Sequence, residues 1–182
     1  HKTPQYSVTG YPMVRVVDIK EGPLNLEDTK LVSKEVYDDF SKGRDPEVGD
    51  LVISRVGSCG NVSYAVSNDR FCLGQNTAFI IPKDSNRYLY YQLVSSSVRD
   101  QMDQLVVGAV QKTISLKSIK QLEVCHPDRP TQERIAGVLG ALDDKIHLNQ
   151  QINQTLESIA QTIFKSWFVD FDPVKAQMEG HE

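Results

Sequence analysis

The most regular pattern in the chain is a stripe of apolar residues near its C-terminal end. Between Thr131 and Val169 apolar side chains return every three or four positions, and no proline interrupts them. This spacing is typical of an amphipathic α-helix, which would be roughly 55–60 Å long over this stretch. The stripe consists of Ile135, Val138, Leu139, Leu142, Ile146, Ile152, Leu156, Ile159, Ile163 and Trp167.

Written as heptads, the stripe forms two seams of the kind that joins two helices in a coiled coil. The polar Asn149 stands in one seam, where such a residue fixes register or strand number at a cost in stability. We predict a helix-pairing interface of Ile135, Leu142, Asn149, Ile152, Leu156, Ile159 and Ile163, with Val138 beside them. The alternative is a core helix that crosses its own domain, although core helices usually end by about 20 residues.

The rest of the chain mixes strand and helix patterns, which predicts an α+β (mixed α/β) globular domain. The predicted strands are Met13–Ile19, Leu51–Val56, Asn61–Val66, Ala78–Ile81 and residues 122–125, and the predicted helices are Thr29–Phe40 and Arg87–Leu105. The steps His126-Pro127 and Arg129-Pro130 disfavour helix before each proline and mark a border. We therefore predict a domain over 1–129, a coiled-coil-forming helix over 130–169 and a linker or frayed tail over 170–182.

A tight turn joins the second and third predicted strands. Its sequence is Gly57-Ser58-Cys59-Gly60, and its glycines can adopt the positive φ angles of a hairpin turn. Arg55, Ser58 and Asn61 surround this tip. An arginine there can fork onto guanine O6 and N7, and backbone N–H groups can approach phosphate. A nucleotide-phosphate loop is the rival interpretation, but neither GxGxxG nor GxxxxGK[ST] is present.

Two later loops carry further polar candidates. Gln75 and Asn76 have amides that can pair with adenine, although amides that stabilise turns are the alternative. The stretch from Gly108 to Lys120 begins as an exposed loop. The predicted DNA contacts are Arg55, Ser58, Asn61, Asn76, Gln111, Lys112 and Thr113, with lysine on phosphate and arginine and amides on bases.

Charge is distributed unevenly along the chain. The whole sequence has a formal net charge of −4, yet residues 51–120 hold 8 basic and 4 acidic side chains. A local basic surface of this kind can face a polyanion even though the chain as a whole is acidic. The alternative is a set of uneven but merely solvated charges. With 40% hydrophobic residues, the 182-residue chain has enough apolar material for one core plus the helix.

Five stretches together resemble the specificity (S) subunit of type I restriction-modification systems. They are YPMVRVVDIKEG, GDLVISRVGSCGNV, LGQNTAFIIP, GAVQKTISLKSIKQLEVCHP and PTQERIAGVLGALDDKIHLNQQINQTLESIAQTIFKSWF. The resemblance covers nearly the whole chain. It implies a non-catalytic target-recognition domain that reads one half of a split DNA sequence, followed by a helix that sets the spacing between half-sites.

The resemblance also implies partners. They are double-stranded DNA, methyltransferase (M) subunits docked on the framework and, through them, a restriction (R) subunit. A full S subunit has two recognition domains, and this chain holds one, so we expect it to be the first half of such a subunit. Reading a bipartite target then needs a second recognition half or a homodimer copy through the long helix.

Other functions find less support in the sequence. A nuclease site of Asp128, Asp143 and Lys145 would place two of its members inside the long helix. A methyltransferase would need a glycine-rich cofactor loop. A coiled-coil adaptor that binds only protein would leave the basic middle unexplained. Cys59, Cys72 and Cys125 have neither CxxC nor zinc spacing, which predicts buried reduced thiols. We predict no cofactor, no metal and, without an apolar run of membrane length or a signal peptide, a cytoplasmic location.

Overall fold

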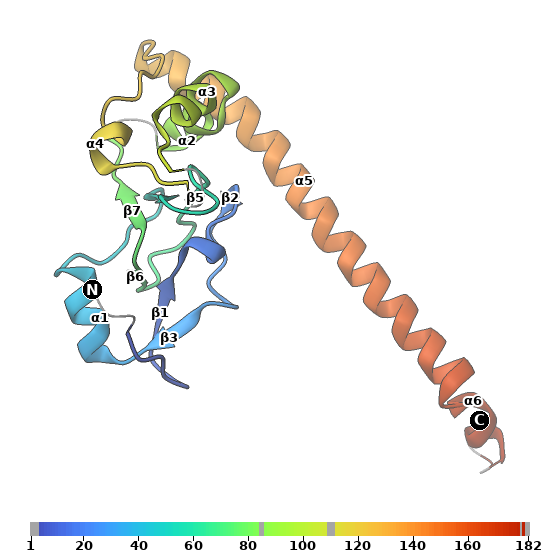
Figure 1. The fold of residues 1–182 in the computed structure, drawn as a ribbon. Helices are drawn as coiled ribbons and strands as arrows, with labels where there is room; N and C mark the ends of the chain where they lie inside the picture. The colour runs from blue at the N-terminus through green and yellow to red at the C-terminus, as the bar shows by residue number, and fades with distance from the viewer. Residues whose placement is uncertain (1–3, 84–85, 109–111, 179, 181–182) are drawn as a thin grey trace. The chain divides into compact units, whose positions relative to one another are not determined.

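The computed structural model describes residues 4–83, 86–108, 112–178 and 180, and the chain divides into two compact units (Figure 1). The first unit is His1–Leu139 and the second is Gly140–Glu182. The first unit holds two small sheets with their helices. The long helix α5 (Arg129–Phe164) begins in the first unit and ends in the second.

The two sheets of the first unit contain seven strands in the described residues. They are β1 (Tyr11–Val14), β2 (Gly22–Pro23), β3 (Lys30–Val32), β4 (Leu51–Ser54), β5 (Val62–Tyr64), β6 (Cys72–Leu73) and β7 (Thr77–Ile80). One sheet has the order β3-β1-β6 and the other has the order β2-β5-β4-β7. The predicted hairpin is confirmed, since β4 and β5 pair antiparallel with Ile53 opposite Val62.

Strand β4 lies at the centre of the domain and is buried on both faces. Leu51 and Ile53 pack in one apolar cluster with α2 (Asn86–Val94) and α3 (Ser96–Leu105). Val52 packs in a second cluster, against Val14 of β1. Because successive strand residues point to opposite faces, helices cover one side of this sheet and the other sheet covers its second side.

The sheet β3-β1-β6 shows the same alternation. Val14 faces the cluster shared with β4, whereas Met13 packs with Tyr37 of α1 (Lys34–Ser41) in a third cluster. Stacking of the Tyr11 and Tyr37 rings at 4.4 Å adds to this contact. The order of layers is therefore α1, the β1 sheet, the β4 sheet and the α2–α3 pair.

Two N-terminal predictions are wrong in part. The predicted strand Met13–Ile19 ends at Val14, because Asp18 accepts a hydrogen bond from the Arg15 backbone N–H at 2.8 Å and turns the chain into the short 3₁₀ helix η1 (Val16–Asp18). The predicted helix Thr29–Phe40 begins as strand β3, which pairs with β1. Its helical part starts only after Ser33, whose hydroxyl caps α1 by accepting from the Val36 N–H.

Two later predictions also need correction. The predicted helix Arg87–Leu105 is two helices, since the Ser95 side chain caps α3 and ends the continuous pattern. The predicted strand at residues 122–125 joins no sheet. Instead, the amide of Gln101 accepts from the Glu123 N–H at 2.8 Å and donates to the Glu123 carbonyl at 2.9 Å. Side-chain amides thus take the place of a neighbouring strand.

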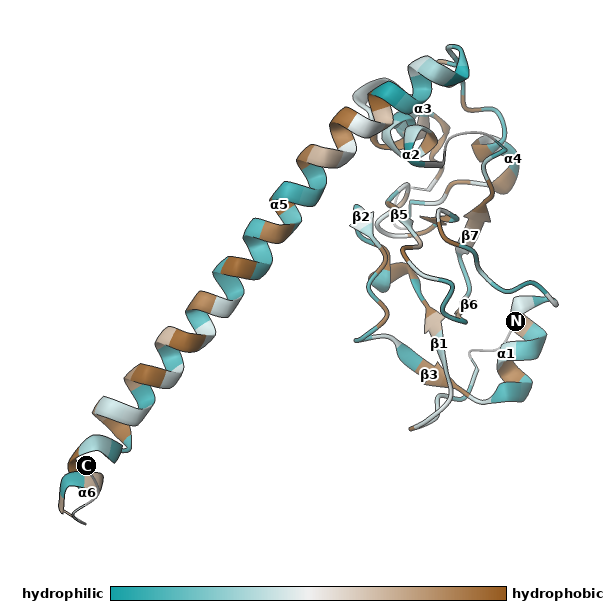
Figure 2. Ribbon diagram, turned by 180° about the vertical axis from the view of Figure 1, so that it is seen from behind, coloured by the Kyte–Doolittle hydropathy of each residue, from teal (hydrophilic) through white to brown (hydrophobic). Residues whose placement is uncertain are grey.

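The predicted long helix is confirmed as an element. Helix α5 continues into a π-helical turn, η2 (Lys165–Val169), and the tail then forms α6 (Asp172–Met178) where a linker was predicted. Apolar bands recur along α5 in Figure 2. All seven residues of the predicted pairing interface are exposed in the single chain, Leu156 by 57% and Ile135 by 37%. Their pairing stays a prediction.

The three thiols are free but differ in burial, which corrects the prediction that all are buried. Cys72 is buried, Cys59 is half-buried and Cys125 is exposed. Burial raises the pKa of Cys72 to about 11. Over the described part of the chain, no helix is long and apolar enough to cross a membrane. A short α4 (Leu116–Ile119) occupies the second half of the predicted loop 108–120.

Candidate nucleic-acid interface

The tip of the β4–β5 hairpin is held by its own backbone. The Ser54 N–H donates to the Asn61 carbonyl and the Gly60 N–H donates to the Ser54 carbonyl, both at 2.9 Å. The buried Ser54 hydroxyl donates to the Ser58 carbonyl. Gly57 and Gly60 have φ angles of 71° and 87°, which favour glycine. The tip is therefore a defined turn rather than a loose loop.

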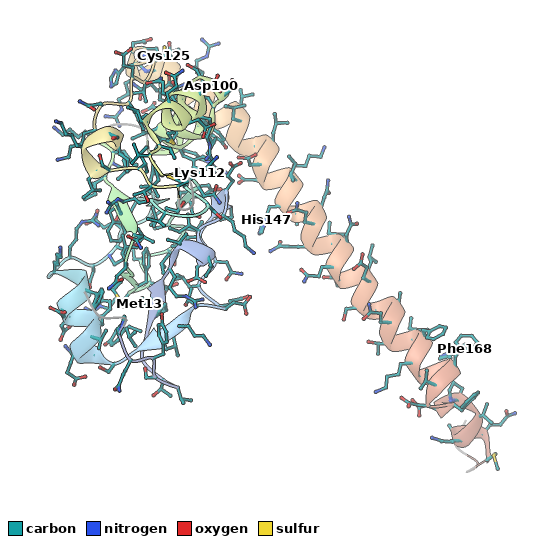
Figure 3. The ribbon with its side chains drawn as sticks, viewed as in Figure 1. Met13, Asp100, Lys112, Cys125, His147 and Phe168 are labelled. Atoms are coloured by element: carbon teal, nitrogen blue, oxygen red, sulfur yellow. The ribbon has the colours of Figure 1, made fainter. Side chains whose placement is uncertain are left out.

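Two further segments are bonded directly to this tip. The Arg55 N–H donates to the Asn76 carbonyl at 2.8 Å, and the Gly57 N–H donates to the Lys112 carbonyl at 3.1 Å. The Ile114 N–H returns to the Arg55 carbonyl at 2.9 Å. Predicted site segments that are far apart in sequence thus lie side by side, and Lys112 of one segment is labelled in Figure 3. We call the surface formed by Arg55–Asn61, Asn76 and Lys112–Thr113 the loop edge.

The loop edge presents polar and basic side chains. Ser58, Asn76 and Lys112 are exposed, and Arg55 is half-buried. The Arg55 Nε donates to the Ile114 carbonyl at 3.3 Å, which holds the guanidinium near the edge. Asn76 has a φ of 64°, a conformation that asparagine tolerates better than most residues. The backbone of this turn thus suits an asparagine, and the Asn76 side chain remains exposed.

Three predicted contacts have different surroundings. The Asn61 side-chain amide donates to the Ile19 carbonyl at 3.4 Å, so part of its hydrogen-bonding capacity serves the fold. Thr113 is half-buried, and its backbone exchanges two hydrogen bonds of 3.0 and 2.9 Å with the backbone of Val107. Gln111 lies outside the described residues. The loop edge thus unites Arg55, Ser58, Asn76, Lys112 and Thr113, with Asn61 at its inner side.

Sequence reasoning missed a basic residue that lies against the tip. Arg99 of α3 pairs with Glu21 at 2.5 Å, and its Nη1 would lie 3.2 Å from a β-carbon placed on Gly60. Its helical pattern indicates only a solvent-facing position, and nothing local connects it with the hairpin. Only the packing of α3 against the hairpin could have identified it.

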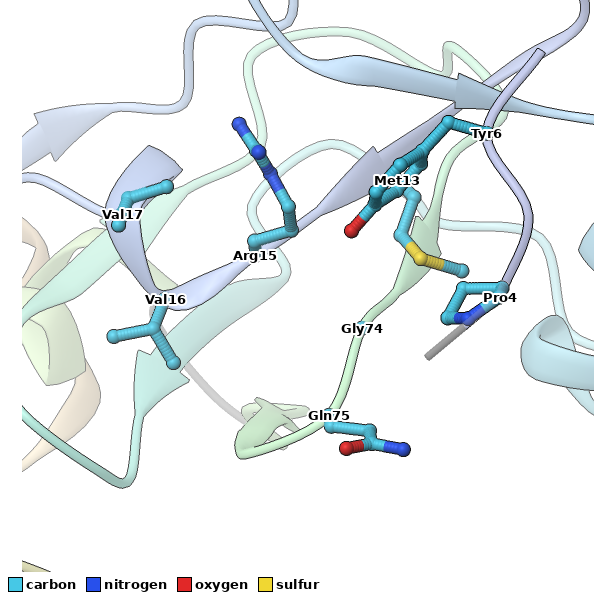
Figure 4. A pocket seen from close by; sticks show the side chains of 8 residues that line it. All are labelled: Pro4, Tyr6, Met13, Arg15, Val16, Val17, Gly74 and Gln75. Atoms are coloured by element: carbon cyan, nitrogen blue, oxygen red, sulfur yellow. The ribbon is translucent and has the colours of Figure 1, made fainter. Parts of the chain in front are cut away.

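An open cleft of about 290 Å³ adjoins the loop edge (Figure 4). It is lined by Pro4, Tyr6, Met13, Arg15, Val16, Val17, Gly74 and Gln75. The turn that contains Gly74 and Gln75 leads directly into Asn76. The cleft therefore meets the loop edge at the step from Gln75 to Asn76. Sequence reasoning did not single out Arg15, which lines this cleft.

The loop edge offers groups for binding rather than for covalent chemistry. Burial raises the pKa of the Cys59 thiol at the tip, so the reactive thiolate is disfavoured at neutral pH. Among the described residues, no three histidine, cysteine or acidic side chains form a group that could hold a metal.

The first unit is a small α+β fold whose polar loop edge is assembled from three separate segments. A family model of the type I restriction modification DNA specificity domain matches residues 2–158, and the chain belongs to this family. The chain is 38% identical over 119 residues to the HindI specificity subunit of Haemophilus influenzae, and 32% identical over 113 residues to the MjaIX specificity subunit of Methanocaldococcus jannaschii.

These relatives are longer proteins. The two alignments cover 64% and 61% of this chain but only 25% and 26% of the relatives. Among solved structures, an S subunit from M. genitalium matches with a TM-score of 0.57 at 17% identity, covering 94% of this chain and 44% of that one. The HsdS subunit of Thermoanaerobacter tengcongensis matches with a TM-score of 0.56 at 12% identity, covering 90% and 42%. The fold is therefore that of specificity subunits.

Proposed function

We propose that the chain is a non-catalytic DNA-reading module, which recognises one half of a bipartite target. The observation that carries this proposal is the loop edge, where backbone hydrogen bonds join Arg55 to Asn76 and Gly57 to Lys112. Three separate segments thereby present one polar and basic surface. Family membership supports the same function, because the matched model describes a DNA specificity domain.

The side chains of the loop edge suit different parts of DNA. Lys112 is exposed and is a point charge, which suits phosphate. Arg55 is held through its Nε, so its two terminal nitrogens remain for a fork onto guanine. Asn76 and Ser58 are exposed and add neutral donors and acceptors. Affinity would then come from phosphate contacts and specificity from the arginine and the amide.

The proposal assigns separate roles along the chain. Residues 1–129 form the target-recognition domain, 130–169 the spacer and dimerisation helix, and 170–182 a linker. A second recognition half, or a second copy of this chain, pairs through the helix. The M subunits dock on this framework and bring the R subunit, and the complex acts on DNA in the cytoplasm.

The second candidate function is a protein-binding adaptor, which the exposed apolar seam of α5 favours. Salt dependence separates the two functions. A protein that neutralises phosphates releases counterions, and its affinity for duplex DNA falls with a log–log slope of about −0.9 per phosphate contact. An adaptor that binds no DNA shows no such dependence.

Replacing Arg55 by alanine tests the proposal. We expect it to weaken binding to the preferred duplex by about 1–3 kcal/mol and to relax one base position. Fluorescence anisotropy with labelled duplexes, at several salt concentrations, measures both effects. The matched control is Lys34→Ala, because Lys34 is an exposed basic residue of α1 outside the loop edge. Absence of salt-dependent binding by the unmodified chain would reject DNA reading and favour the adaptor.

A further inference from the structure

Arg15, at the end of β1, is held in one orientation by a carboxylate. Its Nε donates to Asp18 Oδ2 at 2.9 Å and its Nη2 donates to Asp18 Oδ1 at 2.8 Å. The Arg15 side chain is 29% exposed, whereas that of Asp18 is 10% exposed. The arginine is thus partly open to solvent, and the acid that holds it is almost covered.

This geometry leaves a specific edge of the guanidinium for a ligand. A guanidinium has five N–H groups in a planar fork. Asp18 occupies the edge formed by Nε and Nη2, so the end formed by Nη1 and the second N–H of Nη2 points away from the carboxylate. Two parallel donors in that position match N7 and O6 of guanine, a pairing that is bidentate and planar. Because Asp18 already orders the Arg15 side chain in the folded protein, binding to DNA would cost little further side-chain entropy.

The charge of Arg15 is secure in this environment. The hydrogen bonds that Arg15 donates to Asp18 raise the pKa of the Arg15 guanidinium, and a smaller charge and hydrogen-bond effect of Tyr6 acts in the same direction. Tyr6 lies on the same cleft and is 43% exposed.

Arg15 also lies next to the loop edge. The Gly74 N–H donates to the Val14 carbonyl at 2.8 Å, and a β-carbon at Gly74 would lie 3.6 Å from Arg15 Cγ. Gly74 precedes Asn76 by two residues, and the Asn76 carbonyl accepts from Arg55. Figure 4 shows Arg15 and Gln75 lining one cleft. The surface that carries Arg55 therefore continues to Arg15.

We propose that Arg15 is a second base-reading arginine, which forks onto the major-groove edge of a guanine, and that Asp18 is its positioning residue. This inference rests on the proposed DNA-reading function and adds a base position to it. The competing view is that Asp18 only shapes the η1 turn, since its Oδ2 also accepts from the Arg15 backbone N–H.

The test is Arg15→Lys, which keeps the positive charge but removes the fork. The whole chain and its variant are each used to select from a pool of randomised DNA duplexes, and the bound sequences are counted. We expect one guanine preference of the unmodified chain to weaken by about 5- to 150-fold. The other positions and the slope of affinity against salt stay unchanged, because the charge is retained.

Two further variants accompany the test. Asp18→Asn is expected to weaken the same guanine preference while strengthening binding to non-target duplex, because a negative charge is removed. Arg70→Lys is the matched control, since Arg70 forms an exposed ion pair with Asp45 outside the cleft. Its selected sequences should equal those of the unmodified chain. Thermal unfolding of each variant verifies that the fold is intact.

The outcomes separate this inference from the proposed function. If the unmodified chain selects a sequence and Arg15→Lys selects the same one with equal preference, Arg15 reads no base and the inference is wrong. Uniform weakening across all duplexes would make Arg15 a phosphate contact, and would equally overturn it. If the unmodified chain itself selects nothing, the proposed DNA-reading function fails and the inference fails with it.

Discussion

At the scale of single residues, Gly60 shows how closely the hairpin tip is packed. Its φ is 87°, and a β-carbon there would lie 2.9 Å from Met102 Sδ and 3.2 Å from Arg99 Nη1. Gly57 in the same turn has a φ of 71°, yet a β-carbon there would meet nothing within 4 Å. The two glycines share a backbone requirement and differ in their contact with α3.

This difference gives a matched pair of substitutions. Gly57→Ala should lower the free energy of unfolding by about 1–2 kcal/mol, the cost of a positive φ for a residue with a β-carbon. Gly60→Ala should lower it by roughly 1–3 kcal/mol more, because the added methyl group overpacks the contact with α3. Urea denaturation of both variants measures the difference. Equal losses of unfolding free energy in the two variants would show that a methyl group at position 60 does not clash with α3.

The sequence predicted the residue types of the loop edge better than their roles. Glycine spacing located the turn, and the polar residues around it were identified because turns expose their side chains. Asn61 and Arg15 illustrate what was missing. The amide of Asn61 bonds to Ile19, and Arg15 lies beside Gly74, two residues before Asn76 of the loop edge. Both contacts join segments that are distant in sequence, and local patterns carry no information about such contacts.

At the scale of elements, the prediction succeeded where a single periodicity dominates. The β4–β5 hairpin and helix α5 have unbroken patterns and were identified. The short strands β2 and β6 were missed, because two residues carry no periodicity. The spacing of Leu31, Val32 and Val36 predicts helix where strand β3 lies, whereas Ser33 caps α1 only after that strand. The cap at Ser33, rather than the apolar periodicity, therefore sets the residue at which helix α1 begins.

The extended segment at residues 122–125 offers a test of side-chain amides as strand partners. Gln101 makes two hydrogen bonds to the backbone of Glu123. Gln101→Ala should therefore lower the free energy of unfolding by about 1–3 kcal/mol, because two hydrogen bonds of about 1 kcal/mol each are lost. Chemical denaturation measures the loss.

The same helix contains the control for this substitution. Gln104 is exposed on α3, so Gln104→Ala makes the same change in helix propensity without the contact to Glu123. Its unfolding free energy should stay within about 0.5 kcal/mol of the unmodified chain. If both variants behave alike, the amide bonds to Glu123 contribute nothing to stability.

At the scale of the whole molecule, we expect the exposed seam of α5 to decide the oligomeric state. Leu156 belongs to the predicted helix-pairing interface, in the same heptad seam as Asn149, and is 57% exposed in the single chain. Leu156→Asp should convert a dimer into a monomer, because a buried aspartate in a coiled-coil seam loses its hydration without gaining a partner. Light scattering gives the mass, which is 20.4 kDa for one copy.

A substitution away from the seam controls for charge. Gln161 lies at the heptad position opposite the seam, so Gln161→Asp adds the same charge without entering it. We expect this variant to keep the mass of the unmodified chain, and both variants to retain the unfolding transition of the first unit. An unchanged mass for Leu156→Asp would show that the seam does not mediate pairing.

The bonds that assemble the loop edge run from backbone to backbone. The bonds from the Arg55 N–H to the Asn76 carbonyl and from the Gly57 N–H to the Lys112 carbonyl involve no side chain, although the positive φ angles of Gly57 and Asn76 restrict which residues fit there. Exchanging Arg55 or Lys112 therefore alters what the surface presents while the three segments remain joined. Such a framework separates the chemistry of recognition from the stability of the fold, and allows new preferences to arise by single substitutions without a new architecture.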